Sequence, residues 1–179
     1  ETGAVFSLRR ELLIALYGCV TAVIAGVGLL VRNNLDRIGP LTLIAALLLF
    51  PRRAWPWLFA SGFLAEHSAY TGLQHVYPAR TAALIGLVNI GQNLLAAELV
   101  GRWIGPRIDF AAVVPTARLV LLLLIATFFG GFGGAAVLVW SGTAPDFWNN
   151  QQAWWLSGFL GAAIVVPLIL SWAERGLRF

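Results

Sequence analysis

The sequence contains 179 residues, of which 59% are hydrophobic and only 11% are charged, and its mean hydropathy is +0.81. A soluble globular domain carries about 25% charged residues, so this composition excludes an ordinary soluble domain. The formal charge of +4 comes from arginines that stand singly or in pairs between long apolar runs. Such spacing is typical of membrane-protein loops, and we expect no nucleic acid among the partners. The single cysteine, Cys19, excludes a disulfide framework and a cysteine-based metal motif.

Six apolar segments are long enough, or nearly so, to cross a bilayer, whose core of about 30 Å requires roughly 20 helical residues. In chain order they cover residues 12–31, 38–50, 55–70, 81–104, 119–140 and 154–172. The second segment is short, and a re-entrant loop there would change the number of crossings. We therefore predict an all-α fold, a polytopic transmembrane helical bundle of about six spans.

The arginines predict the orientation of this bundle, because Lys and Arg are retained on the cytoplasmic side. With six spans both termini lie on one face of the membrane, and that face carries nine arginines, whereas the other face carries three. The nine are Arg9, Arg10, Arg52, Arg53, Arg102, Arg107, Arg118, Arg175 and Arg178, and the three are Arg32, Arg37 and Arg80. Both termini should thus be cytoplasmic. Tryptophans mark both predicted boundaries, as interfacial belts do: Trp55, Trp57, Trp103 and Trp172 inside, and Trp140, Trp148, Trp154 and Trp155 outside.

Small residues recur one helical turn apart, as in Gly130 and Gly134, and let helix backbones approach closely. Packing within one chain is the simpler interpretation, and a homodimer contact is the alternative. Pro167 lies inside the sixth segment, where a proline removes one backbone hydrogen bond and kinks the helix. Such a kink can act as a hinge or simply set a shape.

Polar residues inside membrane segments are costly, so they are candidate functional sites. Asn89, Gln92 and Asn93 form one stripe on the fourth segment, which either hydrogen-bonds a neighbouring helix or lines a ligand cavity. Glu98 precedes Arg102 by one turn, and this order predicts an ion pair between them.

The third segment ends in a second polar group, Glu66, His67 and Tyr70, and His75 follows in the outer loop. Glu66 and Tyr70 share a helix face, so the phenol could hold the carboxyl group. Histidine titrates near neutrality and binds transition metals. The hypotheses for this group are therefore a purely structural role, the sensing of a ligand or of protons, and a metal site. The spacing matches no established metal motif.

The remaining polar residues of the predicted outer face line either the polar entrance of a cavity or a solvent-exposed edge of the bundle (Asp36, Arg37, Arg80, Asp146 and the amides at 149–152). The sequence has no nucleophile elbow, no His-Glu-x-x-His motif and no phosphate-binding glycine loop. We therefore expect that this chain is not an enzyme.

Three stretches carry a further pattern. Residues 39–56 form a leucine-rich helix that begins with a proline and ends in an arginine pair and a Trp-Pro turn. Residues 89–102 form the polar fourth helix, and residues 154–168 form a late helix with tryptophan, glycine and proline. Together they resemble the first class of membrane-associated sensor domain, an integral-membrane input module found before bacterial diguanylate cyclases, phosphodiesterases and histidine kinases. The sequence departs from that family in its number of spans and in Ser157, where the family often has an acidic residue.

The resemblance implies a bacterial inner-membrane sensor that detects a small ligand or the membrane state and signals through its C-terminal helix to a cytoplasmic output domain. We expect one domain, with a cytoplasmic segment at 1–10, the bundle at 11–172 and the start of a connector at 173–179. The expected ligand-binding residues are Asn89, Gln92 and Asn93, then Glu66, His67 and Tyr70, with Pro167 and Arg175 in signal transmission. The sequence identifies neither the ligand nor a cofactor. A small-solute transporter or channel subunit, and a scaffold for other proteins, are the alternatives.

Overall fold

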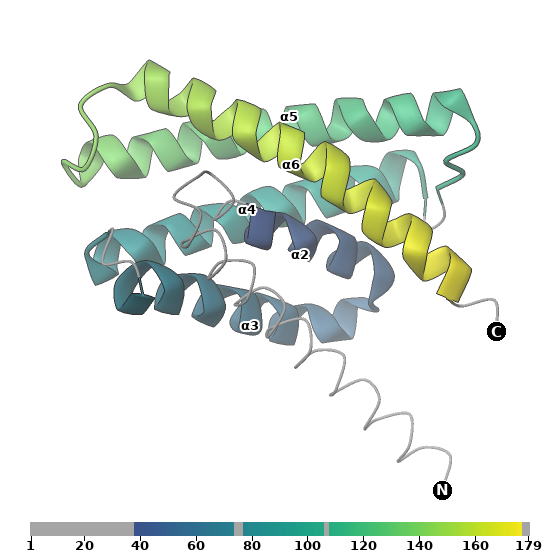
Figure 1. Cartoon of the computed structure of the whole chain (residues 1–179), viewed down its shortest axis with the longest axis horizontal. Coiled ribbons are helices and arrows are strands. Elements are labelled where there is room, and N and C mark those ends of the chain that lie inside the picture. Colours follow the sequence, from purple (N-terminus) through teal and green to yellow (C-terminus); the bar gives the residue numbers. More distant parts are fainter. Residues whose placement is uncertain (1–37, 74–76, 106–107, 177–179) are drawn as a thin grey trace, which may run out of the picture.

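The computed structural model describes residues 38–73, 77–105 and 108–176, and every regular element within these ranges is helical (Figure 1). The helices are α2 (Ile38–Leu49), α3 (Trp55–Ser68), α4 (Ala79–Trp103), α5 (Val113–Trp140) and α6 (Phe147–Gly176). A short 3-10 helix, η2 (Arg52–Ala54), precedes α3, and a π-helical turn, η3 (Ala69–Leu73), continues it. The predicted first span lies outside the described residues, as do Asp36, Arg37, His75 and Arg107.

Five predicted segments correspond to α2 through α6, but two of these helices begin earlier than expected. Helix α5 starts at Val113 rather than at 119, because Pro115 falls in the first turn, where a missing N–H costs little. Helix α6 starts at Phe147 rather than at 154. Asp146 caps it there, since the backbone N–H of Asn149 donates to Asp146 Oδ1 at 3.1 Å. The amide run at 149–152 is therefore helical.

Helices α4, α5 and α6 are long and apolar enough to cross a membrane. Helix α2 has 12 residues and rises roughly 18 Å, which is less than a bilayer core of about 30 Å. Each residue from Leu41 to Leu47 is buried, so α2 is enclosed on all sides along this stretch. A helix that is apolar all round belongs in such a buried position.

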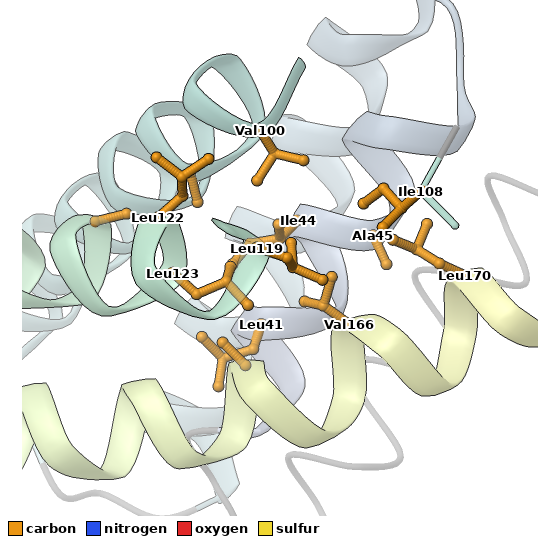
Figure 2. Packing of buried hydrophobic residues seen from close by; sticks show 13 residues of the cluster. Leu41, Ile44, Ala45, Val100, Ile108, Leu119, Leu122, Leu123, Val166 and Leu170 are labelled. Carbon is orange, nitrogen blue, oxygen red and sulfur yellow. The ribbon is translucent and has the colours of Figure 1, made fainter. Parts of the chain in front are cut away.

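The helices form layers in which α2 and α4 occupy the middle (Figure 1). Helix α3 packs against α2 and α4 on one side, while α5 covers α4 and α6 crosses α2 on the other. Helices α5 and α6 also pack against each other. The largest apolar cluster joins side chains from four helices (Figure 2): Leu41 and Ile44 of α2, Val100 of α4, Leu119 and Leu123 of α5, and Val166 and Leu170 of α6.

The glycines at 130–134 let α5 approach both of its neighbours. A Cβ atom on Gly133 would lie 3.0 Å from Val88 of α4, and one on Gly134 would lie 2.5 Å from the Trp154 ring of α6. The prediction that these glycines serve packing within one chain is thus confirmed.

Trp154 and Trp155, which the sequence predicts for the outer interfacial belt, make their contacts inside the bundle. Trp154 is buried against Gly134, and the indole N–H of Trp155 donates to the Leu124 carbonyl at 3.2 Å. Because α6 begins at Phe147, both tryptophans lie two turns inside the helix. Trp140 and Trp148, in contrast, are exposed.

We predict that Gly134→Ala lowers the stability of the bundle by roughly 1–3 kcal/mol, because the added methyl group overpacks the contact with Trp154. Thermal unfolding in detergent measures this effect. The matched control is Gly91→Ala on α4, where an added Cβ meets nothing within 4 Å and the helix should be unchanged or slightly more stable. Equal unfolding temperatures for wild type and Gly134→Ala would contradict the prediction.

Candidate functional site

The polar stripe of α4 faces the interior of the bundle. Asn89, Gln92 and Asn93 are all buried, and they share one side of the helix because residues three and four apart are neighbours there. A buried amide is costly unless it is hydrogen-bonded, so the surroundings of each side chain matter.

Asn89 turns toward α3. Its Nδ2 donates a hydrogen bond of 3.0 Å to Oε2 of Glu66, and both side chains are buried. Gly86 brings the two helices together, since a Cβ at this position would lie 2.9 Å from the Phe63 ring and 3.8 Å from Glu66 Oε2. Within the described residues Glu66 has no ion-pair partner, so an amide rather than a cation meets this buried carboxyl group.

Gln92 turns the other way, toward α5 and α6. A Cβ on Gly130 would overlap its Oε1, and a Cβ on Gly158 would lie 3.9 Å from its Nε2. The neighbouring Thr127 hydroxyl already donates to the Leu123 carbonyl of its own helix at 2.8 Å. Gln92 Oε1 is buried and accepts no hydrogen bond from the described residues. The side chain therefore occupies a slot between two glycines and retains an unused acceptor.

Gln151 of α6 is a second buried amide with an unused atom, and the sequence assigned it to the outer rim. Its side chain is buried, and its Nε2 has no acceptor among the described residues. A Cβ on Gly131 would lie 2.9 Å from the Gln151 carbonyl oxygen, which shows how closely α6 approaches α5 here. Gln151 stands seven residues, or two helical turns, before Gly158, so both lie on the same face of α6. From this spacing the sequence could have predicted that Gln151 faces the interior of the bundle.

His67 and Tyr70 lie beside Glu66 but in different surroundings. The His67 ring stacks on Phe63, with centroids 5.9 Å apart, and its buried Nδ1 has no partner among the described residues. Tyr70 is buried in η3 and packs edge-on against Tyr77 at 5.6 Å. Over the residues that the structure describes, no group of three His, Cys, Asp or Glu side chains could hold a metal ion.

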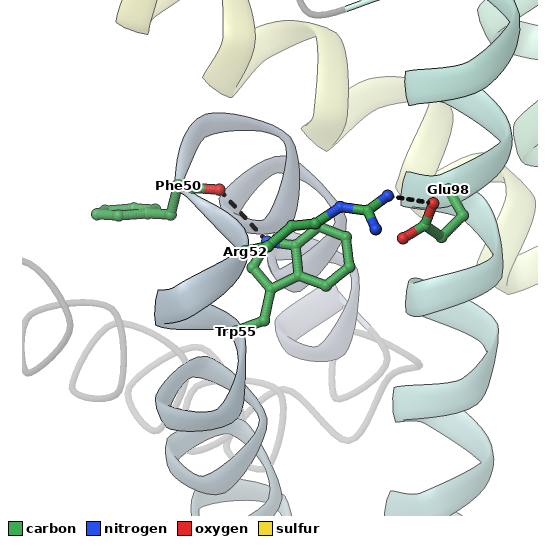
Figure 3. A network of polar contacts seen from close by, with 4 residues as sticks. All are labelled: Phe50, Arg52, Trp55 and Glu98. Carbon is green, nitrogen blue, oxygen red and sulfur yellow. Dashed lines mark hydrogen bonds and ion pairs between the residues drawn. The ribbon is translucent and has the colours of Figure 1, made fainter.

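The predicted ion pair between Glu98 and Arg102 is wrong, because Glu98 pairs with Arg52 at 2.7 Å (Figure 3). The Arg52 guanidinium also lies over the Trp55 ring, 5.3 Å from its centroid, and the Trp55 indole N–H donates to the Phe50 carbonyl at 3.3 Å. Packing of η2 beside α4 brings Arg52 to Glu98, which local helix spacing cannot reveal. Because both side chains are largely exposed, the pair contributes at most about 1 kcal/mol.

The residues assigned to signal transmission lie in the second half of α6. Pro167 stands inside this helix, which continues past it to Gly176. Val166 and Leu170 on either side of it are buried in the main apolar cluster. Arg175 lies in the last turn of the helix.

Comparison with family models matches residues 42–179 to MASE1, the membrane-associated sensor domain. The match covers the buried polar residues of α3, α4 and α6, the η2 turn and all of α6. This chain belongs to the MASE1 family. The family consists of membrane sensory input domains, which favours a sensor over a transporter or channel subunit. Searches of curated proteins and of solved structures found no match.

We predict that Glu66 and Asn89 are energetically coupled across α3 and α4. Removing either partner leaves a buried polar group unsatisfied, whereas removing both leaves none. A double-mutant cycle with Glu66→Leu, Asn89→Leu and the double variant, measured by unfolding in detergent, should give a coupling of roughly 0.6–2 kcal/mol. Additive effects would show that the hydrogen bond contributes nothing to stability.

Proposed function

We propose that this chain is a bacterial inner-membrane sensory module in which a small molecule binds the buried polar side chains of Glu66, Asn89, Gln92, Asn93 and Gln151, flanked by His67 and Tyr70; these five residues are called the buried polar cluster below. The observation that carries the proposal is the unused acceptor of Gln92 and the unused donor of Gln151, both on buried side chains. Buried polar atoms in proteins are nearly always hydrogen-bonded, so a ligand or ordered water is expected to complete them.

The donor set defines the chemistry of the ligand. Gln92 Oε1 accepts a hydrogen bond and Gln151 Nε2 donates one, and neither amide is charged. In the described part of the chain no arginine contacts this cluster, and the only ion pair, between Arg52 and Glu98, lies elsewhere. A small neutral molecule with both a donor and an acceptor fits these groups better than an anion does.

Helix α6 connects the cluster to the output. Gln151 and Gly158 stand two turns apart on α6, with Gly158 beside Gln92, and Val166 and Leu170 pack on α2, α4 and α5 further along the same helix. Because packed helices have discrete arrangements, a shift of α6 at Gln151 is carried toward its C-terminal end. Pro167 removes one backbone hydrogen bond on this path and provides a point of bending before Arg175.

The proposed topology is six spans within residues 11–172, with residues 1–10 and the connector from 173 in the cytoplasm. The connector would join a diguanylate cyclase, phosphodiesterase or histidine kinase domain. The arginines of η2, of the end of α4 and of the start of α5 support this orientation. A homodimer is the alternative to a single module in the membrane.

The ligand is tested by mass spectrometry of an extract from the gently solubilised chain. We expect a small molecule to copurify with wild type and to be lost from Gln151→Leu. The matched control is Gln152→Leu, which changes the neighbouring exposed amide and should retain the molecule. Thermal unfolding of all three proteins confirms that they are folded. An extract that contains only lipid in every case would contradict the proposal.

The topology is tested by reporter fusions in bacteria. A fluorescent protein fused after Phe179 should fluoresce, because the C-terminus is expected in the cytoplasm, whereas alkaline phosphatase inserted at Gly142 between α5 and α6 should be active. The reverse pattern would invert the proposed orientation, and active phosphatase at Gly142 together with a dark fluorescent protein after Phe179 would show that α6 does not cross the membrane between the two sites.

A further inference from the structure

Glu66 carries a carboxyl group inside an apolar bundle. It lies on α3, and only 6% of its surface is exposed. Among the other acids whose side chains the structure describes, Glu98 is paired with Arg52, and Asp109 and Asp146 are exposed. Glu66 therefore differs from these acids, because water cannot solvate its charge where it lies.

The carboxyl group meets an amide at a point where two helices pack closely. Asn89 Nδ2 of α4 donates to Glu66 Oε2 at 3.0 Å, and both side chains are buried. Gly86 stands one turn before Asn89, and a Cβ atom there would lie 3.8 Å from the same carboxyl oxygen and 2.9 Å from the Phe63 ring. An apolar ring and a glycine thus border the oxygen that Asn89 binds.

The titratable side chain next to Glu66 on α3 is His67. Its ring stacks on Phe63, with centroids 5.9 Å apart, and it forms no ion pair with the Glu66 carboxyl group. Tyr70, one turn further on in η3, carries a phenol and packs edge-on against Tyr77. Helix α2, which also packs against α3, has no titratable side chain. Within the described residues, these neighbours supply no cation that pairs with the carboxyl group.

The arginines of α4 and η2 lie near the ends of the helices. Arg80 is in the first turn of α4, and its guanidinium lies over the Trp140 ring, 4.8 Å from the centroid. Arg102 is in the last turn of α4, and Arg52 and Arg53 precede α3, each roughly 20 Å along its helix from the buried carboxyl group. A carboxylate at this position would therefore have no counter-charge among these groups.

We propose that Glu66 is a proton-binding site, and that the bound proton allows α3 to pack against α4. An ionised carboxylate without a counter-charge is costly to bury, whereas a neutral carboxylic acid that is hydrogen-bonded is far less so. Asn89 Nδ2 binds Oε2, which leaves Oε1 to carry the proton. When the proton leaves, a negative charge remains beside Phe63, and the contact between the two helices is lost. The inference rests on the proposed sensory function, because it assigns protons as a stimulus to one residue of the buried polar cluster.

Infrared spectroscopy of the purified full chain at neutral pH tests whether Glu66 holds a proton. A protonated carboxyl group gives a C=O stretching band that a carboxylate lacks. Wild type should show this band, and Glu66→Gln should lose it. The matched control is Asp109→Asn, which changes an exposed acid but keeps its side-chain acceptor and should retain the band. A wild-type spectrum without the band, or a band that persists in Glu66→Gln, would overturn the proposal.

Asn89→Leu provides a second variant for the same measurement. Its band should move to higher frequency, because the carboxyl oxygen loses a hydrogen bond. If Glu66→Gln does not fold, this shift decides the assignment of the band to Glu66, and an unshifted band overturns it.

The pH dependence of unfolding tests whether the proton holds α3 and α4 together. The folded bundle keeps the proton, whereas the unfolded chain exposes the carboxylate to water and releases it. Unfolding then liberates one proton, so the unfolding constant of wild type should rise by up to about tenfold per pH unit relative to that of Glu66→Gln. Parallel pH profiles of the two proteins would contradict the proposal.

The proton site and the proposed ligand site fail separately. A small molecule that copurifies with wild type and is lost from Gln151→Leu, in a protein without the infrared band, would refute the proton site and support the ligand site. The band in a protein that copurifies with lipid alone would support the proton site and contradict the ligand site.

Discussion

Hydrogen-bonding groups are costly where they face lipid, and this constraint fixes the position of α4. Its stripe of amides is incompatible with a surface that faces lipid, so α4 lies in the middle of the bundle and contacts α2, α3 and α5. The stripe then divides: Asn89 serves the contact with α3, and Gln92 points toward α5 and α6. Two different helix interfaces thus depend on one helix face.

Glycines make these polar contacts possible. Gly86 admits Phe63 and Glu66 against α4, while Gly130 and Gly158 leave the space that the Gln92 amide occupies. A side chain at Gly130 would displace that amide, so the close helix approach and the polar chemistry are parts of one arrangement. The glycines of α5 bring this helix close to α4 and α6, because small residues allow dense packing where the hydrophobic effect gives no driving force between helices in lipid.

Directional contacts hold α4 at both ends, whereas α6 meets α5 largely through rings and glycines. Arg52 joins η2 to Glu98 near one end of α4, and Arg80 lies over Trp140 at the other end, 4.8 Å from its centroid. Between α5 and α6, rings such as Phe128 and Trp155 pack edge-on at 5.1 Å. The Trp155 indole N–H also donates to the Leu124 carbonyl at 3.2 Å, so ring packing and a hydrogen bond together fix how α6 lies on α5.

The sequence alone predicted the existence of helices α2 through α6, the inward orientation of the α4 stripe and the family, because bilayer thickness and helix periodicity act on local residue patterns. It could not determine which helix each face would meet. Local spacing paired Glu98 with Arg102, yet Glu98 pairs with Arg52 of η2. Gln151 and Trp154, both predicted for the outer face, are buried between α6 and α5. The partners of a helix face depend on packing between segments far apart in the chain, and only the tertiary structure decided them.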